Sequence, residues 1–484
     1  MKTETPSESS GSHGAAIRDV AVVGGGLAGL SAACALASSG YRVHLIERRP
    51  YVGGRASSYE HPGTGEVVDN CQHILLGCCT NLIGLYRQLG VEERIRWFDR
   101  ITFLEPGGRK SVLEPGILPE PLHNSWSFLA AGALSLRDKL AISRGMMAFL
   151  RGVPEDSEET FAGWLVRHGQ TRRAIDRFWN PVLVSALNED LDRVSVHYAG
   201  MVFRRAFLQS VQGGWMGVPT IPLSELYGHA LEFLQAHGGQ ATLRKSVTGM
   251  QRDAASGSWR VEFEGGCIDA DAVVLALPFE SMQALLPALP AVASGYETRL
   301  AERLQHFEHS PITGIHLWFD RTITDMEHAV LLDTTIQWMY NKSLLQPETR
   351  ARGSENYLEL VVSASKSLVG KSRQEIIDMA LRELAEFFPV VREAKLLKAA
   401  VIKEVRATFS VTPGLDAYRP GAVSGWHRVF LAGDWTATGW PSTMEGAVRS
   451  GYLAAEALTK AAGNPKSFLQ PELPPRGLMR LFRK

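Results

Sequence analysis

The chain is poor in cysteine, and the few that it has are not spaced as a disulfide framework or a zinc site. Five cysteines occur in 484 residues, and no two of them form a Cys-x-x-Cys pair. Cys71, Cys78 and Cys79 lie near His73, but no second ligand pair follows at the spacing of a zinc site. We therefore predict buried or half-buried thiols, no metal ion, and a reducing, cytoplasmic location.

An excess of charge of one sign is also absent. Lys and Arg total 51, and so do Asp and Glu, which leaves a formal net charge of +0. Because the chain then has no long-range field to attract a polyanion, we predict no nucleic-acid partner. Hydrophobic residues make up 45 % of the chain, an ordinary globular share, and its length suffices for two interleaved domains.

No segment has the pattern of a signal peptide or of a transmembrane helix. Residues 1–17 are rich in Ser, Glu, Thr and Gly and lack an apolar stretch, so a disordered tail is predicted. The longest uncharged run, 20–41, contains a cluster of glycines followed by an Ala-rich stretch. That order is typical of a buried strand-turn-helix and not of a membrane span.

Two segments fit either the protein itself or the surface of a membrane. Residues 125–150 interrupt long apolar stretches with Arg137, Lys139 and Arg144, as in a core helix pair or a helix lying on a bilayer. The Pro-rich, basic tail 463–484 ends in four cations interleaved with apolar residues, which suits a solvated tail or a membrane contact. Peripheral attachment to the inner membrane therefore stays an open prediction.

The rest of the chain alternates between strand and helix patterns. A β-branched run at 19–23, helical composition over 27–39 and a second strand at 42–47 predict a βαβ unit at the start. Further strands are predicted at 247–250, 259–263, 272–277, 314–319, 357–363, 398–405 and 429–432, and helices at 373–388 and about 443–458.

The first turn carries a dinucleotide-binding motif. Gly24-Gly25-Gly26-Leu27-Ala28-Gly29 matches Gly-x-Gly-x-x-Gly between the first strand and its helix. Gly24 permits the tight turn, Gly26 lets the backbone approach a pyrophosphate, and Gly29 allows close packing of helix on strand. Glu47 closes the second strand, where a carboxylate accepts hydrogen bonds from ribose hydroxyls.

A second glycine pair favours FAD over NAD. Gly53, Gly54 and Arg55 follow Glu47 and Arg48 closely, so this loop is predicted to fold over the pyrophosphate. Arg55 then offers a planar, charged donor to a phosphate or a flavin carbonyl. A surface turn with a solvated arginine is the simpler alternative.

The C-terminal part carries a third element of the same kind. A strand ends in Gly433-Asp434, and a helix begins near Thr443, Met444, Glu445 and Ala447. Asp434 is predicted to bind a hydroxyl of the cofactor. The backbone N–H groups near Met444 and Glu445 are predicted to face the flavin's pyrimidine oxygen, where negative charge gathers on reduction.

Together these elements resemble the flavin amine oxidase and phytoene desaturase superfamily over about 19–458, and within it the hydroxysqualene dehydroxylases. The more specific similarity lies in Val68 to Gly77, Trp179-Asn180-Pro181, Ala186-Leu187-Asn188 and Gly433 to Gly451. The resemblance implies a mixed α/β fold, with a Rossmann-like FAD-binding domain and an inserted substrate domain of mixed sheet and helices. The FAD domain is predicted from 17–110, 205–285 and 415–462, and the substrate domain from 111–204 and 286–414.

The resemblance also implies site residues beyond the motifs. It places Gln72, His73 and Val247 against the cofactor and makes Asp69 and His73 the candidates for proton transfer. Cys71 departs from the pattern, because this family usually has glycine at that position next to the flavin ring.

The activity that the resemblance implies is the reduction of hydroxysqualene, a C30 isoprenoid, to squalene with loss of water, in squalene and hopanoid biosynthesis. Hydride from reduced FAD would reach an allylic carbocation. The electron donor to FAD stays open, because the sequence has no second Gly-x-Gly-x-x-Gly unit for NAD(P)H. Three alternatives stay open as well: a carotenoid or phytoene-type desaturase, an amine oxidase, and a non-enzymatic isoprenoid-binding protein of the GDP-dissociation-inhibitor type.

Overall fold

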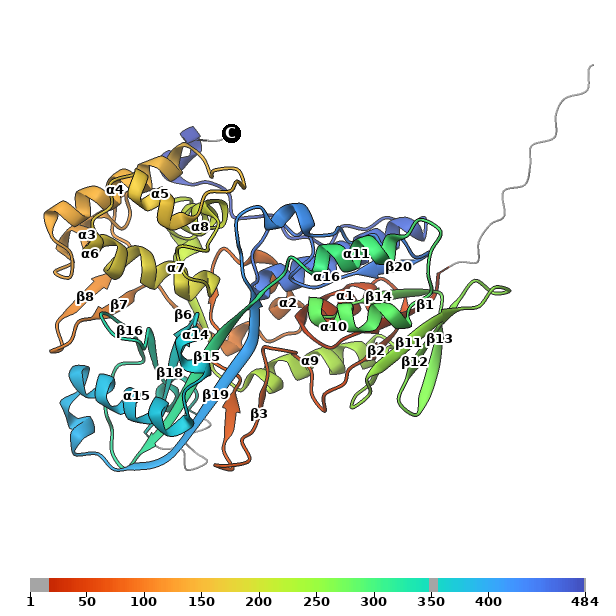
Figure 1. Cartoon of the computed structure of the whole chain (residues 1–484), viewed down its shortest axis with the longest axis horizontal. Coiled ribbons are helices and arrows are strands. Elements are labelled where there is room, and N and C mark those ends of the chain that lie inside the picture. Colours follow the sequence, from red (N-terminus) through yellow and green to blue (C-terminus); the bar gives the residue numbers. More distant parts are fainter. Residues whose placement is uncertain (1–16, 348–355, 483–484) are drawn as a thin grey trace, which may run out of the picture.

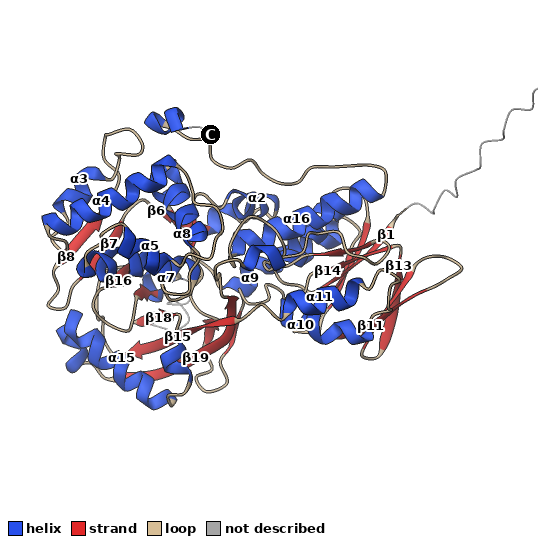
Figure 2. Cartoon of the chain, turned by 45° about the horizontal axis from the view of Figure 1, so that its top comes forward, coloured by secondary structure: helices blue, strands red, loops and turns tan. Residues whose placement is uncertain are grey.

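The structure is a computed structural model that describes residues 17–347 and 356–482. The predicted disordered tail 1–17 lies outside the described residues except for Ile17. In the described part, a parallel sheet with its helices lies at one end of the molecule, and a larger sheet topped by a group of helices lies at the other (Figures 1 and 2). The predicted mixed α/β fold is confirmed.

The parallel sheet has five strands in the order β10-β2-β1-β14-β20. Its strands are β1 (Asp19–Val23), β2 (Arg42–Ile46), β10 (Gln240–Thr242), β14 (Ala272–Leu275) and β20 (Val429–Leu431). All four pairings are parallel, and β14 and β20 are fully buried, as expected for strands covered on both faces. Helices α1 (Leu27–Ala37) and α16 (Met444–Ala461) cover it together, so the two ends of the chain form one layer.

Smaller elements surround this sheet. A three-stranded antiparallel sheet is formed by β11 (Val247–Arg252), β12 (Trp259–Phe263) and β13 (Gly266–Ala270). Another is formed by β5 (Leu75–Leu76), β9 (Met216–Pro219) and β6 (Ile95–Phe98), and β3 (Ser58–Glu60) pairs with β4 (Val67–Asp69). The helices here are α2 (Thr80–Gln88), α9 (Leu223–Ala236), α10 (Phe279–Leu285) and α11 (Tyr296–Leu304).

The larger sheet has seven strands in the order β19-β15-β18-β17-β16-β7-β8. They are β19 (Leu396–Phe409), β15 (His309–Phe319), β18 (Tyr357–Ser363), β17 (Trp338–Asn341), β16 (His328–Leu331), β7 (Ile101–Leu104) and β8 (Lys110–Leu113). Helices α12 (Lys342–Leu345), α14 (Lys366–Val369) and α15 (Arg373–Phe387) accompany it, and the apolar side of α15 packs on one face.

Helices from the middle of the chain cover the other side of this sheet (Figure 2). They are α3 (Ser125–Ala130), α4 (Leu136–Arg151), α5 (Phe161–Arg167), α6 (Arg172–Ala174), α7 (Asn180–Leu187) and α8 (Val196–Val202), with π-helical turns at Ile175–Trp179 and Phe203–Leu208. Their core is aromatic: Phe149 stacks on Trp164 with ring centroids 4.6 Å apart, and Trp179 meets Phe203 edge-on at 4.7 Å. A short C-terminal 3-10 helix, η8 (Gly477–Phe482), lies beside α4.

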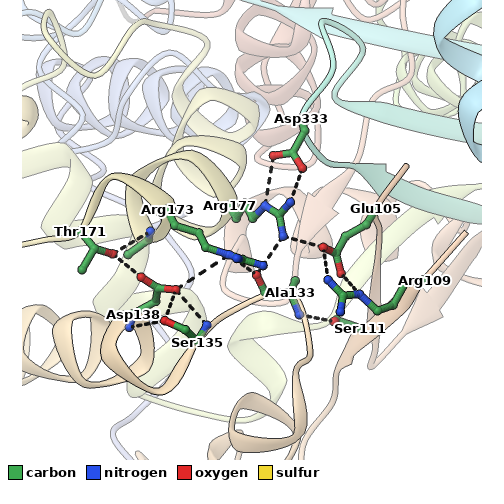
Figure 3. A network of polar contacts seen from close by, with 11 residues as sticks. Glu105, Arg109, Ser111, Ala133, Ser135, Asp138, Thr171, Arg173, Arg177 and Asp333 are labelled. Atoms are coloured by element: carbon green, nitrogen blue, oxygen red, sulfur yellow. Dashed lines mark hydrogen bonds and ion pairs between the residues drawn. The ribbon is translucent and has the colours of Figure 1, made fainter. Parts of the chain in front are cut away.

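A polar network joins these helices to the larger sheet (Figure 3). Arg177 pairs with Glu105 at 2.5 Å and with Asp333 at 2.5 Å, and both acids belong to loops of the sheet. Its guanidinium also donates to the carbonyl of Ala133, ahead of α4. One side chain therefore fixes the helical group against the sheet.

The sheets change two predicted domain boundaries. The predicted FAD segment 17–110 includes β7, which instead belongs to the seven-stranded sheet because it pairs in parallel with β16. The predicted substrate segment 286–414 includes α11, which packs on α10 beside the parallel sheet. Both boundaries were therefore misplaced, since the chain crosses between the two ends through short loops without a composition change.

Candidate active site

One large cavity, of about 830 Å³, runs between the parallel sheet and the seven-stranded sheet. Most residues predicted from the sequence to bind the cofactor line it. These are Gly24, Gly26, Leu27, Ala28, Glu47, Arg48, Gly54, Arg55, Gln72, His73, Val247, Gly433, Asp434, Thr443, Met444, Glu445 and Ala447. Gly25, Gly29 and Asp69 are not part of the lining.

The first turn is built as the motif requires. Gly24 has φ +106°, and a Cβ there would lie 2.4 Å from the carbonyl oxygen of Ala276. A Cβ on Gly29 would lie 1.8 Å from the carbonyl oxygen of Gly24, so only glycine lets α1 start so close to β1. The N-terminus of α1 faces the cavity with unpaired N–H groups, a site suited to a pyrophosphate.

Glu47 holds the two glycine loops in place. One carboxylate oxygen accepts the N–H of Gly25 at 2.6 Å, and the other accepts the N–H of Arg49 at 2.8 Å. Gly53 donates to the carbonyl of Gly25 at 2.8 Å, which closes the second loop on the first. Glu47 still lines the cavity, so its remaining lone pairs face the place expected for ribose hydroxyls.

The second loop is tied to the C-terminal motif by an ion pair. Arg55 meets Asp434 at 2.6 Å and also donates to the carbonyl of Ala407 at 3.0 Å. Burial would lower the pKa of Arg55, but the Asp434 carboxylate, with Glu280 and Glu404 farther away, raises it above its ordinary value. The guanidinium therefore stays charged at the cavity wall.

The start of α16 presents backbone donors to the cavity. Thr443 is the N-cap, and its hydroxyl accepts the N–H of Gly446 at 3.1 Å. The N–H groups of Met444 and Glu445 belong to the first turn, which has no intrahelical partners. The Glu445 carboxylate turns to α2 and accepts the amide of Asn81 at 2.8 Å and the N–H of Leu82 at 2.8 Å. Glu445 thus supports the site through its backbone, while its side chain anchors α2.

The segment after β4 brings its predicted residues to the cavity. Cys71 has φ +116°, a backbone conformation that favours glycine, and its thiol lies against Gly314. The Nδ1 atom of His73 is 2.8 Å from the carbonyl oxygen of Cys71, which can only accept, so Nδ1 carries the hydrogen. Burial lowers the pKa of His73, so the ring is neutral and its Nε2 atom is an acceptor.

Asp69 lies behind this segment in a buried cluster of charges that sequence reasoning missed. Lys342 donates to Asp69 at 2.6 Å and to the side-chain oxygen of Gln72 at 2.9 Å, and lies 3.6 Å from Glu359. Burial would raise the pKa of Asp69, but Lys342 holds it below its ordinary value. Because Asp69 is ionised and outside the lining, it positions Gln72 and does not suit proton donation. The available signal was that Lys342 is the single charged residue in the stretch 336–345.

The other half of the cavity is apolar. Helical residues Pro181, Val182, Ala186, Met201, Val202 and Phe207 line it from one side, and Ile312, Val330, Trp338, Tyr340 and Val361 line it from the larger sheet. Among the described residues of this half none carries a carboxylate. The cavity therefore joins a polar half that holds the motifs to an apolar half that suits a hydrocarbon.

A second residue missed from the sequence lies at the edge of the polar half. Arg205 places its guanidinium 4.5 Å from the ring centroid of Trp440 and pairs with Glu472 at 3.0 Å. Burial lowers the pKa of Arg205, since this loss of hydration exceeds the effect of Glu472. It lies in a π-helical turn, whose start could not be read from periodicity.

These features together define a flavin-dependent oxidoreductase: two glycine loops, a ribose-facing carboxylate and a helix start converge on one cavity. Residues 27–459 match the model of the flavin containing amine oxidoreductase family, and the chain belongs to that family. Its cofactor is FAD. Within the described residues, no helix is long and apolar enough to cross a membrane.

Relatives of known identity cover nearly the whole chain. A 15-cis-phytoene desaturase of Synechococcus elongatus is 29 % identical over 463 residues, covering 91 % of this chain and 95 % of its own. A zeta-carotene desaturase of Synechocystis sp. is 25 % identical over 479 residues, covering 91 % and 96 %. Among solved structures, a putrescine oxidase gives a TM-score of 0.69 at 19 % identity, covering 92 % and 98 %, which shows the shared fold.

Proposed function

We propose that this flavoenzyme acts on a long, linear isoprenoid and that its reaction is desaturation. The observation that carries the proposal is the apolar half of the cavity, which opens directly into the half that holds the flavin motifs. The relatives named phytoene desaturase and zeta-carotene desaturase support the same substrate class and reaction.

His73 lies where desaturation needs a proton acceptor. FAD, when bound, takes up the hydrogen and electron pair of one substrate C–H bond. A proton must then leave the neighbouring carbon so that the double bond forms. His73 lines the cavity as a neutral ring whose Nε2 atom can accept that proton.

The surrounding residues hold the loop of His73 in position and keep water away from the substrate. Lys342 holds Gln72, which donates to the carbonyl of His73 at 3.1 Å, so the loop that carries the base is fixed from behind. The apolar wall excludes water from an electron-poor carbon chain, and Trp338 and Tyr340 add stacked rings 5.5 Å apart.

Reduction of hydroxysqualene to squalene is the second candidate. The sequence similarity that favours it lies on the cavity wall, because Pro181, Ala186 and Asn188 line the cavity. That reaction needs a proton for the leaving hydroxyl, and a neutral His73 with a lowered pKa is a poor donor. An amine substrate finds less support, because the carboxylates of the cavity lining, such as Glu280 and Glu404, lie outside the apolar residues named above.

The two reactions separate in one experiment. Oxidised holoenzyme with a quinone acceptor is incubated with phytoene, and dithionite-reduced holoenzyme is incubated without oxygen with hydroxysqualene. Lipid extracts are then resolved by chromatography. We expect a phytoene product with one more double bond and no squalene. Squalene formed from hydroxysqualene, with phytoene unchanged, would establish the second candidate instead.

A further inference from the structure

We propose that one face of the molecule docks on an anionic lipid bilayer and is the side from which substrate reaches the cavity. This face, called the α4 face, consists of 117–122, α3, α4 and η8 (Figures 1 and 2). The entry of substrate rests on the proposed function, whereas the docking rests on the surface alone.

Exposed apolar side chains are concentrated on this face. Eighteen large hydrophobic residues are exposed in the described chain, and eleven of them lie here. They are Ile117, Leu118, Leu122, Trp126, Leu129, Leu136, Leu140, Met147, Leu478, Leu481 and Phe482. Trp126 is 79 % exposed and Leu481 is 79 % exposed, although both side chains lose free energy in water. A concentration of exposed apolar side chains on neighbouring elements is typical of a binding face.

Helix α4 has the arrangement of an interfacial helix. Its exposed apolar residues Leu136, Leu140 and Met147 fall on one stripe, because they recur at four and seven residues. Arg137, Arg144 and Arg151 recur every seven residues and form a parallel basic stripe beside it. An apolar stripe flanked by arginines is what a helix needs to lie in the headgroup region.

Charge on the α4 face is mainly positive, although the whole chain is neutral, and the half-exposed Glu114, whose backbone contacts Ser127 of α3, lies at its edge. In 115–151 the acidic residues are Glu120 and Asp138, which are 9 % and 3 % exposed and therefore hidden from a partner. Arg476 and Arg480 add two exposed cations on the C-terminal side, where 473–482 contains no acid. This complementarity selects an anionic bilayer over a neutral one.

The C-terminal segment is held on this face by hydrogen bonds. The N–H of Leu478 donates to the carbonyl of Glu120 at 2.8 Å, and Arg204 donates to the carbonyl of Phe482 at 3.1 Å. Lys139 donates to the carbonyl of Leu129 at 2.6 Å and so ties α4 to α3. Three separate segments therefore form one surface.

The opposite side of α4 packs against the rest of the protein. The exposed apolar stripe is therefore not the side of α4 that the core buries. Asp138 accepts from the hydroxyl of Thr171 at 2.5 Å and from Ser135 at 2.6 Å (Figure 3). Ile142 and Phe149 are buried in the aromatic core.

The α4 face adjoins the cavity. A second, small hollow of about 20 Å³ is lined by Pro115, His123 and Asn124 from the loop leading into α3. It shares Ile101, Ala206 and Phe207 with the large cavity, so the two spaces adjoin at these side chains. Movement of the half-buried Phe207 would open a path for a hydrocarbon from the bilayer to the apolar half.

Flotation of the purified holoenzyme with vesicles tests the docking. We expect binding to vesicles of phosphatidylcholine with phosphatidylglycerol, and much less to phosphatidylcholine alone. The triple variant Arg137→Gln, Arg144→Gln, Arg151→Gln should bind the anionic vesicles on the order of a hundredfold more weakly, given the usual contribution of each cation. The triple variant Leu136→Ser, Leu140→Ser, Met147→Ser should bind on the order of a thousandfold more weakly, given the usual contribution of each inserted apolar side chain. The matched control Arg373→Gln, Arg382→Gln, Arg392→Gln on and after α15 should bind as the wild type does.

Equal binding by the wild type and the arginine variant, with FAD content and thermal midpoint unchanged, would overturn the proposal. So would an absence of vesicle binding by the wild type. If the wild type elutes as a dimer that the serine variant converts to monomers, a second copy covers the face and the proposal fails.

Turnover separates docking from the proposed function. The arginine variant should turn over isoprenoid in detergent micelles at the wild-type rate and lose turnover from vesicles. Equal losses in both would contradict the entry route. If no isoprenoid is turned over in either form, the proposed function fails while the flotation result still stands.

Discussion

Arg55 and Asp434, 379 residues apart in the chain, meet in an ion pair of 2.6 Å at the wall of the cavity. Asp434 also accepts the hydroxyl of Ser442 at 2.5 Å, just before α16. The contact joins the second glycine loop to the C-terminal motif, so the flavin site is complete only when both ends of the chain have come together.

Loss of Arg55 should therefore weaken FAD binding. Arg55→Ala leaves the buried Asp434 carboxylate without its charged partner, and we expect about 1–3 kcal/mol less favourable FAD binding. Titration of apoprotein with FAD, followed by flavin fluorescence, measures this. The control is Arg42→Ala, which breaks an exposed pair with Asp19 and should leave FAD affinity unchanged. FAD affinity equal to the wild type in Arg55→Ala would contradict the assignment.

Loss of Glu47 should likewise weaken FAD binding, at the place expected for the ribose. Glu47→Ala removes the acceptor for the N–H groups of Gly25 and Arg49 as well as the expected ribose contact. We expect a loss of roughly 1.5–3 kcal/mol in FAD affinity. Equilibrium dialysis of the purified variant measures it. Glu232→Ala, on the exposed side of α9, is the control. Full retention of FAD by Glu47→Ala would show that the ribose assignment is wrong.

The first turn should tolerate no side chain at Gly29. Gly29→Ala would place a Cβ 1.8 Å from the carbonyl oxygen of Gly24, so α1 must move away from β1. We expect the variant to purify without FAD and with a lowered thermal midpoint. Gly228→Ala, in α9, meets nothing within 4 Å and should behave as the wild type. A Gly29→Ala protein with full FAD content would mean that this close approach is not required.

The buried charge cluster should make stability depend on pH. Burial raises the pKa of Glu359 from 4.5 to about 7, because Lys342 only partly offsets the loss of hydration. Between these values the folded protein keeps a proton that the unfolded chain has lost, so raising the pH favours unfolding. The contribution is complete below about pH 4.5 and is lost as the pH rises through about 7.

Glu359→Gln should remove this dependence, because its side chain cannot ionise. Across that pH range, the free energy of urea unfolding of the wild type should fall relative to that of Glu359→Gln by on the order of 2–4 kcal/mol. The comparison with the variant isolates Glu359, because buried histidines such as His73, whose pKa is lowered, act with the opposite sign in both proteins. Glu264→Gln, exposed next to the β12–β13 turn, is the control. Parallel curves for the wild type and Glu359→Gln would contradict the buried, proton-holding carboxyl.

Much of the nucleotide half could be predicted from the sequence, because its contacts are local or carried by motifs. Gly24 to Gly29 and Glu47 lie on one βαβ unit, whose spacing alone places them at one edge of the sheet. The strand and helix positions at both ends of the chain were predicted within a few residues for the same reason.

The charge cluster and the α4 face could not be predicted in the same way. Lys342, just after β17 of the larger sheet, meets Asp69, at the end of β4 in a separate two-stranded sheet, across 273 residues. No local pattern encodes that contact. For α4, Ile142 and Phe149 enter the core as the core interpretation predicts, while Leu136 and Leu140 face outward. Contact of these two leucines with a bilayer stays a proposal. The predicted boundaries failed at β7 and α11 because the chain changes sheet without a linker.

The central claim is that the flavin is reduced by an isoprenoid C–H bond, with His73 taking the proton. The most direct measurement is anaerobic mixing of oxidised holoenzyme with phytoene in anionic vesicles, followed through the visible absorption of the flavin. The absorption should bleach in one turnover, with a matching amount of product that has one more double bond. With FAD content unchanged, His73→Ala should form the product about a hundredfold more slowly than the wild type, because the proton leaves after the flavin has been reduced. The control His168→Gln should match the wild type. No bleaching by phytoene, together with reoxidation of the reduced enzyme by hydroxysqualene, would contradict the account.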